Sequence, residues 1–260
     1  MFSVTYAQLN GWLTAFLWPL TRILALIATA PVFGNTSLSV RVKVGLGAFI
    51  TLIVAPTLPA MPQVTVFSAN GVWIIVNQFL IGAALGLTMQ VVFATIAATG
   101  ELIGLNMGLS FASLFDPSLG ETTDVMSRYF NAIATLAFLS LDGHLQVIAA
   151  LIETFRSVPI SANVLNAAGW KMLAEWGSSI FAGGLLLALP VVAAILISNL
   201  ALGILNRAAP QIGVFQIGLP LTLLVGMLLV QFMLPNMIPF FSHLFDGGIE
   251  ELGRVAAAFR

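Results

Sequence analysis

The chain has 260 residues, of which 59% are hydrophobic and only 7% are charged, and its formal net charge is −1. A soluble domain typically carries about 25% charged residues, so this composition excludes a soluble domain and predicts an integral membrane protein. The small net charge indicates neither a nucleic-acid partner nor an anionic-lipid partner. The absence of cysteine excludes disulfides, thiol redox chemistry and thiolate metal sites.

Six long apolar stretches follow one another along the chain, each close to the ~20 residues that span a bilayer as a helix. They occupy residues 11–33, 42–61, 71–109, 125–151, 178–205 and 212–241. All are expected to be helical, because a chain in lipid must satisfy its own backbone hydrogen bonds. No basic region precedes the first stretch, so we expect an uncleaved span rather than a signal peptide. The predicted fold class is an all-α membrane protein with about six long helices and short re-entrant or amphipathic segments.

The third stretch is too long for one membrane crossing. As a single helix it would extend ~58 Å at 1.5 Å per residue, against ~30 Å of hydrocarbon. We expect it either to break near Gly100 or to pack against protein outside the bilayer. Basic residues also divide equally between the two sides of six alternating spans, so the positive-inside rule assigns no orientation.

Glycines recur at intervals of four in this same stretch, as Gly82 and Gly86 and then as Gly100, Gly104 and Gly108. Small residues at this spacing allow two helix backbones to approach closely. The alternative is that glycine is simply frequent in membrane helices. The three glycines in register favour a tight helix crossing.

Several polar residues lie within or next to the apolar stretches, where each is costly in lipid and usually faces protein or water. They are Arg22, Gln90, Glu101, Asn199 and Arg207. An ion or proton path would need acids at several depths, and Glu101 is the one clear intramembrane acid. We therefore favour hydrogen bonds and salt bridges between helices or subunits.

The usual components of a catalytic or metal site are missing from the sequence. His144 and His243 lie in unrelated segments, and no zinc-ligand pair, phosphate-binding glycine loop or nucleophile elbow occurs. We predict no catalytic residue, no metal site and no cofactor.

Segment 110–124, SFASLFDPSLGETTD, predicts an ordered re-entrant loop. Asp116 and Pro117 can begin a helical turn, and Ser118 and Glu121 have the spacing of a capping box. The alternative is a plain loop outside the membrane.

Further along, the last two apolar stretches form a hairpin joined by 206–211, in which Pro190 and Pro220 should kink the helices. Residues 242–260 predict an amphipathic helix.

Four segments together resemble the FliR family of flagellar type III export-gate subunits. They are APVFG (30–34) followed by Arg41-Val42-Lys43, GELIGLNMGLSFASLFDP (100–117), DGH (142–144) and NLALGILNRAAPQIGVFQIGLPL (199–221). The resemblance implies a FliP-like part over 1–177, a FliQ-like hairpin over 178–241 and the tail 242–260. It adds Lys43 to the structural or inter-subunit polar residues.

Members of that family join FliP-like and FliQ-like subunits in a hetero-oligomeric ring closed by a single FliR-like copy, with an FlhB-like subunit at the cytoplasmic entrance. The resemblance thus implies export of unfolded flagellar proteins through the bacterial inner membrane, within the flagellar basal body, by a complex displaced toward the periplasm. It also implies that 110–124 projects into the pore as a plug. The plug candidates are Met107, Phe111, Leu114, Phe115, Asp116 and Pro117, because apolar side chains close a pore to ions by dewetting.

Three alternatives remain from the sequence. The related injectisome export subunit shares much of the pattern. A small-solute secondary transporter or channel would show an inverted repeat with broken helices, and no such symmetry is visible. A purely structural membrane scaffold would tolerate polar replacement of 110–124.

Overall fold

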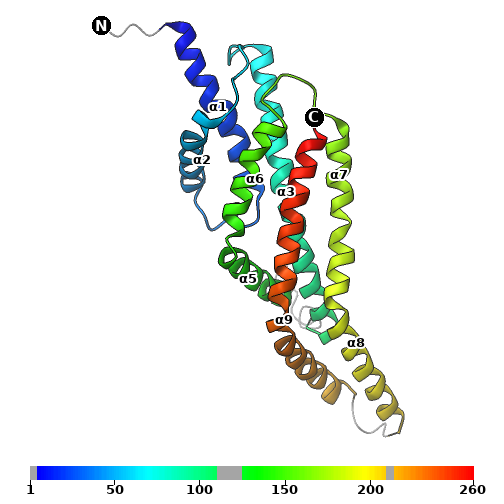
Figure 1. Ribbon diagram of the computed structural model, residues 1–260. Helices are drawn as coiled ribbons and strands as arrows, with labels where there is room; N and C mark the ends of the chain where they lie inside the picture. The colour runs from blue at the N-terminus through cyan, green and yellow to red at the C-terminus, as the bar shows by residue number, and fades with distance from the viewer. Residues whose placement is uncertain (1–4, 110–124, 209–213) are drawn as a thin grey trace. The chain divides into compact units, whose positions relative to one another are not determined.

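The computed structural model describes residues 5–109, 125–208 and 214–260, and all the regular elements within these ranges are helices. They are α1 (Tyr6–Thr29), α2 (Val40–Val54), the short 3-10 helix η1 (Ala55–Thr57), α3 (Ala69–Met107), α5 (Val125–Ser140), α6 (Gly143–Ser157), α7 (Ala167–Gly177), α8 (Ser179–Ala208) and α9 (Val214–Ala258) (Figure 1). The predicted all-α fold class is confirmed.

The helices long and apolar enough to cross a membrane number five in the described ranges, or six if one bent pair counts as a span. The five are Gln8–Thr29, Val40–Thr57, Ala69–Met107, Ala167–Ala208 and Gly218–Ala258. The bent pair is α5 and α6, which meet at 68°. The predicted stretch 125–151 is therefore broken, because Asp142 adopts a left-handed conformation with φ 55° just before α6.

The third predicted stretch forms one continuous helix. α3 has 39 residues and contains Gly100 without interruption, so the first of the two expected alternatives, a break near Gly100, is wrong. Since α3 extends ~58 Å at 1.5 Å per residue, its length exceeds a ~30 Å hydrocarbon core.

The last helix is also longer than the sequence indicates. α9 has 45 residues and includes Pro220, Pro235 and Pro239. It joins the sixth apolar stretch to the amphipathic tail, so residues 242–258 continue an existing helix. Each proline removes a backbone donor and crowds the carbonyl four residues earlier, but its fixed φ near −65° is helical, and the helix continues through all three positions.

The chain divides into two compact units. Unit 1 comprises Met1–Val91, Asp142–Gly177 and Phe245–Arg260, and unit 2 comprises Val92–Leu141 and Ser178–Leu244. The division predicted from the FliP-like and FliQ-like parts, at residues 177 and 241, rests on likeness to other subunits and stays a prediction.

In unit 1, α3 packs closely against α1 at two of the predicted glycines. A Cβ on Gly82 would meet the backbone oxygen of Arg22 and, at 2.8 Å, the Cβ of Ala25. A Cβ on Gly86 would meet the hydroxyl of Thr29. The two helix backbones lie so close here that only glycine fits without a shift.

The end of α9 is anchored in unit 1 by an aromatic contact. Phe259 is buried, and its ring lies 5.0 Å from that of Trp170 in an edge-to-face arrangement. The Phe259 backbone oxygen accepts a hydrogen bond from the Asn166 amide at 3.1 Å. These contacts attach the segment before α7 to the last turn of the chain.

Candidate functional site at the foot of segment 110–124

The helix that leads into segment 110–124 ends in a defined cap. Gly108 has φ 85°, the Leu109 amide donates to the Gly104 carbonyl at 3.1 Å, and the Gly108 amide donates to the Leu105 carbonyl at 3.1 Å. This pair of bonds is the Schellman motif, in which a left-handed glycine satisfies the last carbonyls of a helix. Gly108 is thus the point where the chain leaves the helix axis.

Met107 lies immediately before this cap and is fully buried in unit 2. Its backbone oxygen accepts a hydrogen bond from the Thr222 hydroxyl at 3.2 Å. A Cβ on Gly226 would lie 2.5 Å from the Met107 Cγ and 2.8 Å from its sulfur. The thioether therefore fills the space that a side chain at Gly226 would need. It packs the C-terminal end of α3 against α9.

We expect Gly226→Ala to be destabilising alone and markedly less so when Met107 is also replaced by alanine, because the added methyl group then takes vacated space. Coupling between contacting residues is typically about 0.5–3 kcal/mol. Thermal melting of the two single variants and the double variant measures it. Gly203, which has no atom within 4 Å of a built Cβ, is the control: Gly203→Ala with Met107→Ala should be additive within about 0.5 kcal/mol. Additivity for Gly226→Ala would contradict the packing described.

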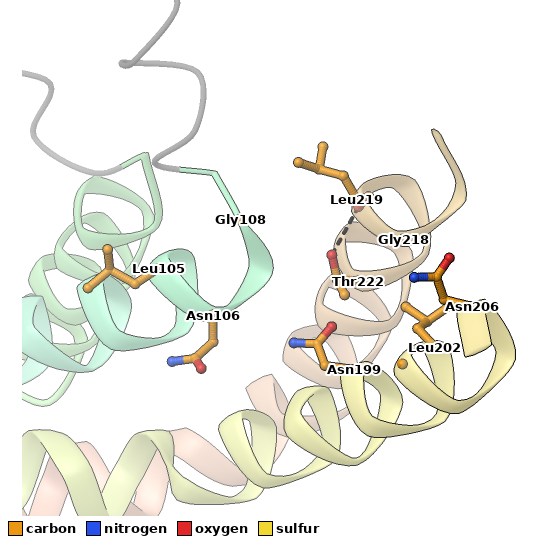
Figure 2. A pocket seen from close by; sticks show the side chains of 10 residues that line it. Leu105, Asn106, Gly108, Asn199, Leu202, Asn206, Gly218, Leu219 and Thr222 are labelled. Carbon is orange, nitrogen blue, oxygen red and sulfur yellow. Dashed lines mark hydrogen bonds between the residues drawn. The ribbon is translucent and has the colours of Figure 1, made fainter. Parts of the chain in front are cut away.

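A cavity of about 470 Å³ lies beside this cap, between the ends of α3, α8 and α9 in unit 2. Its lining residues are Leu105, Asn106, Gly108, Asn199, Leu202, Gly203, Asn206, Gly218, Leu219 and Thr222. Figure 2 shows Asn106 extending from α3 toward α8, and Asn199 extending from α8 toward the same space. The cavity is therefore lined by both amide and apolar side chains.

The remaining plug candidates lie outside the described residues. They are Phe111, Leu114, Phe115, Asp116 and Pro117. Of the predicted plug set, the structure thus places Met107 alone, and it places that side chain inside the packing of unit 2.

The other glycines of the predicted series also lie in unit 2. A Cβ on Gly100 would be 2.6 Å from the Met126 carbonyl oxygen and 2.7 Å from the Ser127 Cα. The Ser127 hydroxyl donates to the Ala97 carbonyl at 2.7 Å. The first turn of α5 therefore lies directly on α3 at Gly100, while Gly104 is buried one turn further along.

Arg22 is fully buried in unit 1 and donates hydrogen bonds to two other helices, α3 and the end of α6. Its Nε donates to Gln78 Oε1 at 2.8 Å, Nη1 to the Thr154 carbonyl at 3.0 Å and Nη2 to the Val158 carbonyl at 3.0 Å. The guanidinium carbon lies 4.3 Å from the Phe155 ring centroid. Both carbonyls belong to the C-terminal end of α6, where the helix dipole is negative, so the cation caps α6 without a carboxylate.

The other predicted polar residues are less enclosed. Lys43 donates to the Gly34 carbonyl at 2.8 Å, which holds the start of α2 to the loop after α1. Gln90 is exposed and lines an open cavity of about 540 Å³ with residues of that loop. Glu101, Asn199 and Arg207 are exposed in unit 2.

Sequence reasoning missed the partners of these groups. Gln78 and Thr154 bind Arg22, and Asn106 and Asn206 line the cavity in unit 2. Gln78 and Asn106 could have been found as polar residues within the third apolar stretch, whereas Thr154 carries no such signal. Within 5–109, 125–208 and 214–260, no three His, Cys, Asp or Glu side chains gather as metal ligands would.

These features define the class: a multi-spanning, all-α membrane protein whose polar groups serve helix packing. Residues 13–248 match the family described as "Bacterial export proteins, family 1", and the chain belongs to that family. A flagellar biosynthetic protein FliR from Pectobacterium carotovorum is 50% identical over 91% of this chain and 90% of its own length. The FliR of Escherichia coli K12 is 48% identical over 95% and 94%, and that of Bacillus subtilis is 27% identical over 83% and 84%.

Proposed function

We propose that this chain is a subunit of the flagellar type III export gate, where it forms, with FliP-like and FliQ-like subunits, the pore through which unfolded flagellar proteins leave the cell. The observation that carries the proposal is the family match over residues 13–248. The near-complete coverage of relatives named flagellar biosynthetic protein FliR supports the flagellar branch over the injectisome branch. The role is one of transport and assembly, with an FlhB-like subunit at the cytoplasmic entrance.

The length of α3 supports a position partly outside the plane of the bacterial inner membrane. The end of α1 contacts α3 at Gly86. α3 then continues to Met107, which adds about 30 Å at 1.5 Å per residue. A helix of this length is accommodated when part of it is surrounded by other subunits rather than by lipid, as in a complex displaced toward the periplasm.

The exposed surface of the long helices supports assembly with other subunits. Within the described chain, the most apolar parts of the spans Ala167–Ala208 and Gly218–Ala258 are only 28% and 22% buried, against 61% for Ala69–Met107. Asn199 and Arg207 lie exposed on α8. Because polar groups in spanning helices usually face protein or water, this pattern favours further subunits beside α8.

The segment 110–124 is proposed as the pore plug on the basis of its sequence and of the resemblance. It follows a hydrogen-bonded cap at Gly108, which supports a defined point of departure from α3. A constriction of apolar side chains excludes ions because water is unfavourable there, while a translocating chain can displace it.

The proposed function is tested by deleting the gene in the bacterium that encodes this chain. We expect hook and filament proteins to be absent from the culture medium but present in the cells, and expression of the chain from a plasmid to restore their export. Normal export by the deletion strain would overturn the proposal.

The plug is tested by replacing Phe111 and Phe115 together with serine. We expect the complex to assemble in normal yield but to conduct small ions, because hydroxyl groups remove the barrier to wetting. Conductance of assembled complexes in planar bilayers measures this. The control is Phe67→Ser, since Phe67 is 91% exposed in the loop before α3. Absence of a leak at normal yield would show that 110–124 is a connector.

A further inference from the structure

The cavity beside the Gly108 cap in unit 2 is lined by neutral residues alone. Its lining consists of three asparagines, three glycines, three leucines and one threonine. Its volume of about 470 Å³ lies within the range of about 300–1,000 Å³ that is usual for ligand pockets. A charged lining would attract ligands of one sign and repel those of the other, so this neutral lining suits a ligand whose charge varies.

The three asparagines bring amide groups to the cavity from two helices. Asn199 and Asn206 lie seven residues apart on α8, which places them on one face of that helix, and Asn106 extends from α3 (Figure 2). The Asn106 amide nitrogen donates to the Leu102 carbonyl at 2.7 Å. Among residues 5–109, 125–208 and 214–260, the Asn199 and Asn206 side chains find no hydrogen-bond partner. Each therefore offers a donor and an acceptor to a ligand.

The cavity also leaves room for a polypeptide backbone beside these amides. Gly203 lies one turn after Asn199, and a Cβ built on it meets no atom within 4 Å. Leu105 borders the cavity from α3 and is 51% exposed. The Thr222 hydroxyl is already used, because it donates to the Met107 carbonyl at 3.2 Å. The groups left for a ligand are thus two amides, open space at a glycine and an apolar contact.

We infer that this cavity binds the main chain of an unfolded protein in transit, with Asn199 and Asn206 hydrogen-bonded to its peptide groups. An asparagine side chain carries the same donor and acceptor as a peptide group, so it can pair with a chain of any sequence. An extended chain has free N–H and C=O groups, whereas a helix pairs them internally. The cavity therefore fits an extended substrate rather than a helix of another subunit.

The inference rests on the proposed function, and it adds the chemistry by which one pathway accepts many sequences. Its test places a photocrosslinking amino acid at Gly203 in the complete complex in cells, because a side chain there enters open space. The probe is an exported protein fused to a stably folded domain, which arrests it in transit. We expect a crosslink from Gly203 to the arrested protein.

Two sets of variants connect that crosslink to the asparagines. Replacing Asn199 and Asn206 together by leucine should weaken the crosslink per assembled complex about tenfold, as the loss of two hydrogen bonds would. The matched control is Asn236→Leu, which should leave the crosslink unchanged. Asn236 is also exposed in unit 2, on α9, but it does not line the cavity.

The sequence of the arrested segment separates main-chain recognition from side-chain recognition. A serine-rich version and a glutamate-rich version should give crosslinks that differ by no more than about twofold, because their peptide groups are the same. A version with proline at every second position should crosslink about tenfold less, since each proline lacks the N–H donor.

Four results would overturn the inference. They are a crosslink from Gly203 to another subunit or to this chain instead of the arrested protein, an undiminished crosslink in the double leucine variant, an equal crosslink to the proline version, and a large difference between the serine-rich and glutamate-rich versions. A crosslinker at Phe111 follows passage of the substrate separately. Absence of the arrested protein from both Gly203 and Phe111 would instead refute the proposed export pore, which keeps the two failures distinct.

Discussion

Replacing Arg22 by methionine is expected to destabilise the protein by about 3 kcal/mol or more, because a buried acceptor left without its donor costs about 1–3 kcal/mol. The variant keeps most of the side-chain volume but removes the Arg22 donors to the Gln78 and Val158 oxygens, and one of the donors to the Thr154 carbonyl, which also accepts the Val158 amide at 2.9 Å. At about 2–4 °C per kcal/mol for a chain of this size class, the melting temperature should fall by about 10 °C. Tryptophan fluorescence in detergent follows the transition.

Two further variants separate the geometry of Arg22 from its charge. Arg22→Lys keeps the charge but cannot reach three acceptors with one ammonium group, so it should recover only part of the stability. Arg41→Met removes an exposed arginine of α2 that has no partner in the described chain. It should change stability by no more than about 0.5 kcal/mol. Equal stability of Arg22→Met and the wild type would contradict the capping role.

Two identical glycine-to-alanine changes in unit 1 are expected to have opposite effects on stability. Gly82→Ala should cost about 1–3 kcal/mol, as overpacking does, since the new methyl group meets the Arg22 backbone oxygen, which can move only with α1. Gly45→Ala should stabilise by about 0.5–1 kcal/mol, because nothing lies within 4 Å of its Cβ on α2.

Thermal melting of the two alanine variants against the wild type checks both signs. A gain in stability from Gly82→Ala would contradict the close α1–α3 crossing. A loss of stability from Gly45→Ala as large as the loss expected from Gly82→Ala would show that Gly45 serves a purpose other than packing within the chain, such as contact with another subunit.

The helical class and the number of long helices could be predicted from the sequence because the bilayer imposes length and apolarity on every span. Breaks within the helices could not be predicted in the same way. Gly100 continues α3, because α5 packs against it and glycine there serves the crossing. Asp142 interrupts a stretch that hydropathy alone reads as one helix.

The candidate site was only partly accessible to sequence reasoning. Glu101 and Arg22 are conspicuous as charges among apolar residues, so their need for partners could be predicted. Which residues satisfy Arg22 depends on tertiary structure, since Thr154 and Val158 lie more than a hundred residues away. Met107 is an apolar residue beside a plug segment, and only the contact with Gly226 reveals its packing role.

The most direct test of the account is co-expression of this chain with FliP-like and FliQ-like subunits, followed by size-exclusion chromatography in mild detergent and mass measurement of the eluted species. We expect a single complex containing all three proteins, and aggregation of the chain when it is expressed alone, because its polar groups and glycine-lined faces then lack partners. A monodisperse monomer that is stable alone and does not bind the other two subunits would contradict the account.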